Sequence, residues 1–241
     1  MTCFDVIEAM KSLMIILFIC TLVVDAVQPT VDLDVGSIKG LRTSIGNTTC
    51  DAYLSVPFAE PPIGNYRFEK TVPVRSWTGV RDTKIEPLPC ASINPRDPAF
   101  NETSKDCLYV NVFTPPKEVV CKLKQSFINE FRVLMLVNFL PIVFVIHGDE
   151  WCMIGTLERT KLFQGYTISK NRAVNLIRNK IVIVAIQYRL AYFGFASDGS
   201  SELPGNLGYW DQKEALEFIS RNSASFSGDK NRITVIGHPA G

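Results

Sequence analysis

The chain has two histidines: His147 directly follows a short apolar run, and His238 follows another after one glycine. Asp149 and Glu150 come shortly after the first histidine. Imidazole and carboxylate groups can act as general bases or bind a divalent metal, provided that the fold brings them together. The spacing requires neither role. We therefore expect no metal and no other cofactor, neither histidine acting as a base, and solvated carboxylates on an irregular loop.

Short alternating apolar stretches, broken by Gly, Pro and Asn, fill residues 36–80 and predict an antiparallel β region. Beyond it, continuous runs rich in Val and Ile are typical of strands buried on both faces of a parallel sheet. The expected strands are 108–113, 141–146, 181–186 and 233–236, with helices at 161–178 and 209–220. This order predicts an α/β fold with a mostly parallel central sheet.

Several ordered blocks resemble the N-terminal part of the type-B carboxylesterase and cholinesterase family. They are residues 58–64, Arg67-Phe68, 106–112, 140–148, 188–190, 205–212 and 237–241. The resemblance implies an α/β-hydrolase fold, of which residues 27–241 would be the N-terminal portion. It also implies a disulfide between Cys90 and Cys107. By resemblance, the family's activity is the hydrolysis of carboxylic esters.

The family's nucleophile is the Ser of a Gly-x-Ser-x-Gly elbow, and the matching position here is Pro239. Proline has no hydroxyl, and its ring fixes φ near −65°, whereas the elbow residue needs a positive φ. The oxyanion-hole loop of the family reads His-Gly-Gly-Gly. Here Gly148 is followed by Asp149 and Glu150, whose charges would oppose a developing oxyanion. Ala240 keeps the position that would supply the second backbone N–H.

In this fold the acid and the histidine follow the elbow, so a chain ending at residue 241 is expected to be truncated and inactive, with no catalytic site intact. Three alternatives stay open: an incomplete gene model of an active carboxylesterase, a non-catalytic cholinesterase-like adhesion or binding protein, and a pseudogene product without function. A small ester would be a substrate only if a full-length active form exists.

Three features depart from the family pattern. Lys105 stands where the family has a Glu that pairs with the Arg at position 67. Residues 117–139 form an unusually long connector, either an extra amphipathic helix or intron-derived sequence in a mistaken gene model. Truncation after the strand at 233–236 would also leave Ile233, Val235 and Ile236 on an unpaired, apolar edge.

Residues 1–26 are expected to be a signal peptide, with Met10 as an alternative start, because a short basic segment precedes an apolar run at 13–24. That run is too short to span a bilayer, so we expect secretion and no membrane span. The sequons at Asn47 and Asn101 are candidate glycosylation sites and agree with this route.

Seven cysteines and a net charge of +1 complete the sequence-level picture. Five cysteines lie beyond residue 26, an odd number, and the pairing of Cys50, Cys121 and Cys152 stays open. The balanced charge gives no electrostatic reason to expect a nucleic-acid partner. The sequence names no protein partner.

Overall fold

The computed structural model describes residues 28–91, 103–116, 139–148 and 170–237. Nearly all of these residues belong to one compact unit, formed by Thr30–Lys117 and Val137–Gly241. The second unit, Met1–Pro29 with Glu118–Leu136, lies almost wholly outside the described residues. The expected signal peptide and the connector at 117–139 therefore cannot be compared with the structure, except for Phe139.

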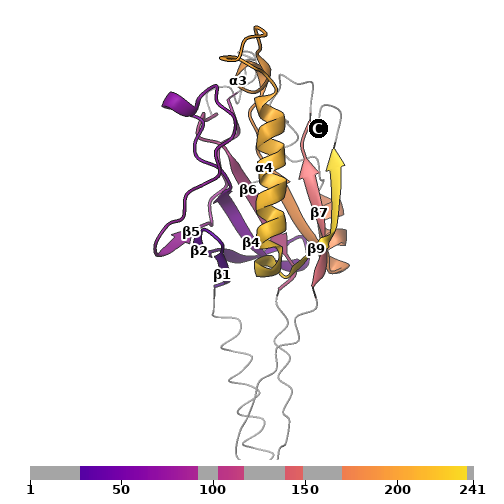
Figure 1. Ribbon diagram of the computed structural model, residues 1–241. Coiled ribbons are helices and arrows are strands. Elements are labelled where there is room, and N and C mark those ends of the chain that lie inside the picture. Colours follow the sequence, from indigo (N-terminus) through magenta and orange to yellow (C-terminus); the bar gives the residue numbers. More distant parts are fainter. Residues whose placement is uncertain (1–27, 92–102, 117–138, 149–169, 238–241) are drawn as a thin grey trace, which may run out of the picture. The chain divides into compact units, whose positions relative to one another are not determined.

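Two sheets form the framework (Figure 1). The smaller sheet has the order β1-β2-β5, with β1 at Thr30–Leu33, β2 at Gly36–Lys39 and β5 at Val80–Asp82. The larger sheet has the order β3-β4-β6-β8-β7-β9. Its strands are β3 (Leu41–Ile45), β4 (Thr48–Pro57), β6 (Tyr109–Thr114), β8 (Val182–Ile186), β7 (Leu140–Ile146) and β9 (Gly228–Gly237).

The large sheet is mixed. The β3-β4, β4-β6 and β6-β8 pairings are antiparallel, whereas β7 runs parallel to both β8 and β9. The expected α/β class is confirmed, although the antiparallel part of this sheet is larger than the sequence indicated. The apolar runs of β7 and β8 do form buried central strands.

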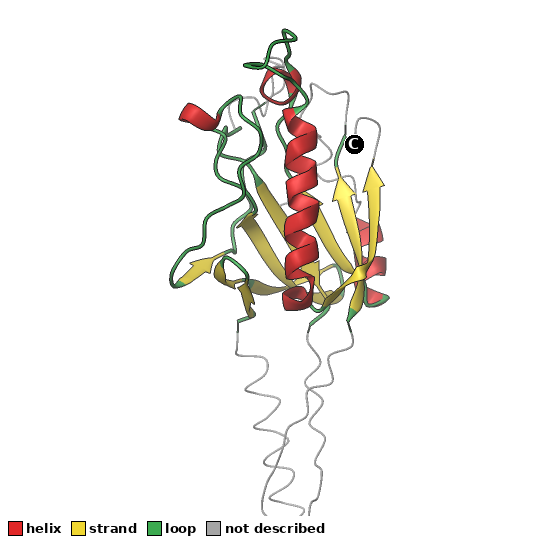
Figure 2. Ribbon diagram, viewed as in Figure 1, coloured by secondary structure: helices red, strands yellow, loops and turns green. Residues whose placement is uncertain are grey.

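Helices cover both faces of the large sheet (Figure 2). The long helix α4 (Leu207–Asn222) packs Ala215, Phe218 and Ile219 into one core. Helix α2 (Lys170–Arg178) contributes Ala173 and Ile177 to a second core on the other face. A sheet covered on both sides explains why β7 and β8 read as continuous apolar runs. The remaining helical segments are η1 (Gly64–Tyr66), α3 (Ala191–Phe195) and η3 (Ser223–Phe226).

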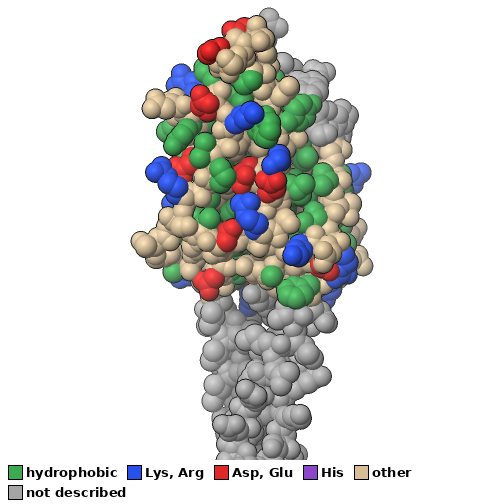
Figure 3. Space-filling view, viewed as in Figure 1, with side chains coloured by type: hydrophobic (Ala, Val, Ile, Leu, Met, Phe, Trp, Pro, Cys, Tyr) green, Lys and Arg blue, Asp and Glu red, His purple; other side chains and the backbone are tan. Residues whose placement is uncertain are grey.

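The start of the compact unit is tied to the end of α4. The backbone N–H of Asp34 donates to Asn222 Oδ1 at 2.8 Å, and Asn222 Nδ2 donates back to Asp34 Oδ1 at 2.7 Å. Arg221 adds an ion pair to Asp34 at 3.1 Å. Basic and acidic side chains are interspersed over the face that carries α4 (Figure 3).

Candidate active site

Two neighbouring parallel strands lead toward the positions that matter for catalysis. The register of β7 against β9 places Ile146 opposite Gly237, so the segments that follow both strands begin at the same edge of the sheet (Figure 1). Gly237, the first residue of the elbow-like pentapeptide, is the last residue of β9. The ends of β7 and β9 are therefore direct neighbours in the sheet.

Gly148 is the last described residue on the β7 side, and it is buried. The other positions singled out from the sequence lie outside the described residues: Asp149, Glu150, His238, Pro239 and Ala240. The possible metal set of two histidines and two carboxylates cannot be compared with the structure, because His147 is its only described member.

His147 is packed as a core residue. Its side chain is buried and stacks on Tyr188, with ring centroids 4.6 Å apart, and the Tyr188 hydroxyl donates to the His147 backbone carbonyl at 2.7 Å. Neither ring nitrogen has a hydrogen-bond partner among the described residues. Burial lowers the pKa of His147 to about 4. The imidazole is therefore neutral near pH 7, and no described acid orients it as a base would require.

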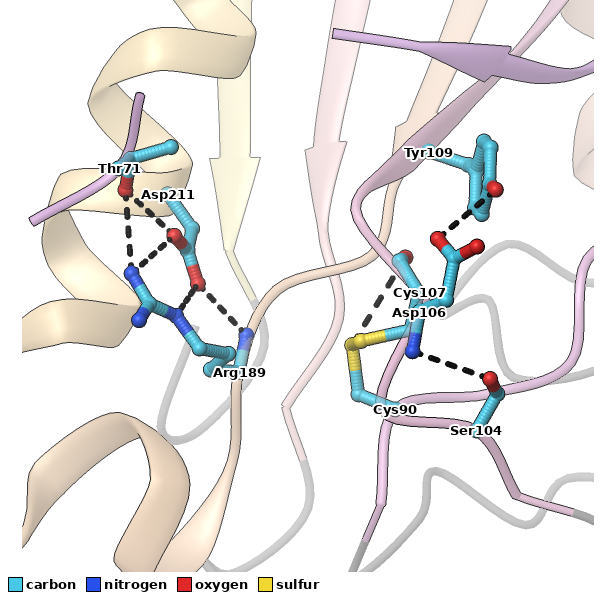
Figure 4. The surroundings of a disulfide bond; sticks show 8 residues. All are labelled: Thr71, Cys90, Ser104, Asp106, Cys107, Tyr109, Arg189 and Asp211. Carbon is cyan, nitrogen blue, oxygen red and sulfur yellow. Dashed lines mark hydrogen bonds and ion pairs between the residues drawn. A yellow bond between two sulfur atoms is a disulfide. The ribbon is translucent and has the colours of Figure 1, made fainter. Parts of the chain in front are cut away.

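The strongest polar cluster near this edge joins β8 to α4 (Figure 4). Arg189 donates from Nε and Nη2 to the two carboxylate oxygens of Asp211, both at 2.8 Å, and its backbone N–H donates to the same carboxylate at 2.9 Å. Thr71 donates to Asp211 Oδ1 at 2.5 Å. Arg189 Nη1 reaches the carbonyl of Glu69 at 2.8 Å. This buried cluster fixes the chain after β8 against α4.

Sequence reasoning did not find this pair. Arg189 and Asp211 each lie in a block that carries the family resemblance, yet they are 22 residues apart, and charged residues are seldom fully buried. The available signal was that each block has a single charged residue: Arg189 in 188–190 and Asp211 in 205–212. In the structure Asp211 is the buried ion-pair partner of Arg189, which explains why both blocks contain a charged residue.

The disulfide implied by the resemblance is present between Cys90 and Cys107 (Figure 4). Next to it, Ser104 donates its backbone N–H to Pro89 and accepts from the N–H of Ala91, both at 2.9 Å. Cys50 is a buried free thiol, and burial raises its pKa to about 12, so it is unreactive near pH 7. Cys121 and Cys152 lie outside the described residues.

The two candidate glycosylation sites differ in what the structure describes. Asn47 is exposed in the turn between β3 and β4, where a glycan would remain in solvent. Asn101 lies outside the described residues.

Lys105 packs against an aromatic ring and forms no ion pair with a described residue. Its ammonium lies 5.6 Å from the centroid of the Phe193 ring. The Nε of Arg67 is buried and has no hydrogen-bond partner among the described residues. Among the described residues, no acidic side chain forms an ion pair with Arg67.

Comparison with known proteins decides the family. The model of the carboxylesterase family matches residues 27–241. The chain belongs to the carboxylesterase family. It is 32% identical to carboxylesterase 3B of Mus musculus over 228 residues, which cover 89% of this chain and 35% of that protein. It is 33% identical to esterase cest-33 of Caenorhabditis elegans over 213 residues, covering 86% of this chain and 34% of that protein.

A third relative, the medium-chain fatty acyl-CoA hydrolase precursor of Anas platyrhynchos, is 31% identical over 230 residues and is covered to 36% of its length. This carboxylesterase-family chain thus spans about a third of the length of the relatives that it matches. Among its described helices, none combines the length and the apolar character needed to cross a bilayer.

Proposed function

We propose that this chain is a secreted member of the carboxylesterase family that does not hydrolyse esters. The observation that carries the proposal is Pro239, which occupies the nucleophile position of the pentapeptide that begins at the end of β9. Without a hydroxyl at this position, no acyl intermediate can form there. Proline is also incompatible with the positive φ of the elbow, so the turn itself would be altered.

The neighbouring loop supports the same conclusion. The register of β7 and β9 directs the loop after Gly148 and the elbow segment to one edge of the sheet. In the family pattern that loop presents backbone donors to the oxyanion, and here it carries Asp149 and Glu150. Removing one donor typically costs about 10²–10³ in kcat, and two added carboxylates would also repel the developing charge.

Secretion and glycosylation complete the proposal. The apolar run at 13–24 supports a signal peptide, and the exposure of Asn47 supports glycosylation at that sequon. The disulfide between Cys90 and Cys107 agrees with an oxidising compartment. Secretion of a tagged chain, with a mobility shift that peptide N-glycosidase reverses and that Asn47→Gln reduces, would test this part.

A chimera tests the catalytic part most sharply, because it supplies the downstream acid and histidine. Residues 27–241 are fused to the downstream portion of an active family member, and the product is assayed for fluorophosphonate labelling and for p-nitrophenyl ester hydrolysis. We expect neither in the parent chimera. Labelling of the parent at any serine of residues 27–241 would contradict the proposal.

Three variants of the chimera separate the causes. The kcat of P239S alone for p-nitrophenyl ester hydrolysis should stay at least about 100-fold below that of the active relative, because the oxyanion loop is still acidic. P239S combined with D149G and E150G should recover activity. As a matched control, P239S combined with D198G and E202G removes two exposed carboxylates from another loop and should recover none. Full activity of P239S alone would show that the loop is not impaired.

A further inference from the structure

A cavity of about 430 Å³ opens beside β5 and shares no residue with the segments that follow β7 and β9. Its volume lies within the range of pockets that hold small organic ligands, about 300–1,000 Å³. Strands β4, β5 and β6 each contribute to its wall. The lining combines apolar with charged side chains: Pro57, Pro87 and Leu88, and Arg81, Asp82 and Asp106.

Arg81 supplies a positive charge to this cavity. Its guanidinium carbon lies 4.3 Å from the centroid of the Trp77 ring, and Trp77 Nε1 donates to the carbonyl of Ser37 at 3.1 Å, which fixes that ring. Arg81 forms no ion pair with a described residue. An aromatic contact therefore holds the guanidinium in place and leaves its N–H groups available to a carboxylate.

Asp106 supplies a negative charge to the same cavity. Its Oδ1 accepts a hydrogen bond from the Tyr109 hydroxyl at 2.8 Å, and its backbone N–H donates to Ser104 Oγ at 3.0 Å (Figure 4). No described residue forms an ion pair with this carboxylate. The next residue, Cys107, is cross-linked to Cys90, so the backbone that carries Asp106 is anchored.

The two charges act on one hydroxyl in the cavity wall. Burial raises the pKa of Tyr109 to about 12, its hydrogen bond to Asp106 adds to the rise, and the positive charge of Arg81 opposes it. The third charged residue of the wall, Asp82, is already paired with Lys84 at 2.8 Å. Within the described part of the chain, the cavity thus presents one uncompensated charge of each sign.

We propose that this cavity binds a small zwitterion, either an amino acid or a dipeptide with an apolar side chain. The carboxylate of the ligand accepts hydrogen bonds from Arg81, its ammonium donates to Asp106, and its side chain covers Leu88, which is 53% exposed. Each charge of the ligand meets an opposite charge when it leaves water, which offsets the cost of desolvation. This binding does not depend on whether the chain hydrolyses esters.

Saturation-transfer NMR with the intact chain tests the proposal, with L-leucine and glycyl-L-leucine as the probes. For each probe, the C-terminal amide removes the carboxylate and the N-acetyl form removes the ammonium. We expect at least one probe to bind about 10-fold more tightly than both of its derivatives, because each derivative lacks one charge-assisted hydrogen bond. An amide or an N-acetyl form that binds as tightly as its zwitterion, or no binding of either probe, would overturn the proposal.

Variants assign the two ends of the ligand. R81M and D106N should each weaken binding of the zwitterion about 10-fold, and D106N keeps an acceptor for the Tyr109 hydroxyl. The matched controls R178M and D198N remove exposed charges elsewhere and should leave the affinity unchanged. Unchanged affinity in R81M or in D106N would overturn the assignment.

The derivatives distinguish a lost contact from a damaged fold. R81M should leave the weak affinity for the amide unchanged, since the amide has no carboxylate for Arg81 to bind. For the same reason, D106N should leave the affinity for the N-acetyl form unchanged. Equal losses for the zwitterion and for these derivatives would contradict the proposed orientation.

Discussion

The carboxylate of Asp211 is completely buried and bound by the guanidinium and backbone N–H of Arg189. We expect D211N to reduce the free energy of unfolding by about 3–5 kcal/mol, because the arginine would remain buried without its counter-charge. The control E217Q removes an exposed carboxylate on the same helix, paired with Lys213, and should change it by less than about 0.5 kcal/mol. Urea unfolding measures the free energy of unfolding of both variants. Similar losses of stability in D211N and E217Q would contradict a structural role for the Arg189–Asp211 pair.

Glu86 should make stability decrease as the pH rises. One of its carboxylate oxygens is buried without a partner among the described residues, and burial raises its pKa from 4.5 to about 7. The folded state then holds this proton more tightly than the unfolded state, so stability is lost progressively between about pH 4.5 and pH 7. E86Q keeps the shape and removes the charge. It should match the parent at pH 4.5 and exceed it by about 1–2 kcal/mol at pH 8, which is less than the full pKa difference would give because solvent screens this partly exposed carboxylate.

His147 gives the opposite slope, since its pKa is lowered from 6.5 to about 4 and its contribution is lost as the pH falls through that interval. Plotting the difference between E86Q and the parent removes this contribution, because both proteins contain His147. A difference that does not change between pH 4.5 and pH 8 would show that Glu86 titrates normally.

At the scale of elements, β9 has one edge on β7 and pairs with no other described strand. Val235 and Ile236 are 48% and 45% exposed on opposite faces of the sheet, while Ile233 packs partly against the core. The expected apolar edge is therefore present in two of its three residues. Such an edge is a template for pairing with another chain.

We expect the isolated chain to self-associate through β9. Replacing Val235 and Ile236 by Lys should increase the monomer fraction in sedimentation velocity, because two adjacent charges disfavour edge-to-edge pairing. The control L88K changes a comparably exposed residue elsewhere and should leave association unchanged. Amides 231–236 should also exchange faster than those of β7. A parent chain that stays monomeric at micromolar concentration would refute the edge argument.

The sequence patterns predicted the buried central strands correctly but not the full extent of β9. The runs at 141–146 and 181–186 were predicted as buried strands and are β7 and β8, since burial on both faces requires continuous apolar sequence. The strand expected at 233–236 begins earlier, at Gly228, which pairs with Leu140 of β7; Asp229–Arg232 lie in an irregularity of the register, and regular pairing resumes at Ile233. Tertiary contacts of this kind override local propensity.

The candidate site was predictable to a different degree. The neighbouring ends of β7 and β9 followed from the fold that the motifs implied, and the structure confirms them. The burial of His147 against Tyr188 did not follow, because an aromatic contact 41 residues away leaves no local pattern. The buried Nε of Arg67, which has no hydrogen-bond partner among the described residues, was not predicted either, because its burial also depends on residues far away in the sequence.

At the scale of the whole molecule, the disulfide between Cys90 and Cys107 closes a loop with a sequence separation of 17. A cross-link of that span stabilises by about 3 kcal/mol, chiefly through the unfolded chain. The double variant C90A/C107A should lose about that much in urea unfolding, and dithiothreitol should then have no further effect. C50A removes a buried thiol and keeps the disulfide, so this control should lose stability in dithiothreitol to the same extent as the parent. Equal dithiothreitol sensitivity of parent and double variant would contradict this.

The contacts between Asp34 and the end of α4 join positions 187 and 188 residues apart, and β7 is synthesised before both of its neighbours in the sheet. During translation the hairpin of β1 and β2 therefore cannot form its contacts with the end of α4 until Asn222 has left the ribosome. Over that interval the apolar face of β4, β6 and β7 that α4 covers in the folded chain has no completed partner. Translation speed before residue 222 and the supply of chaperones should thus control the yield of folded chain, independently of its equilibrium stability.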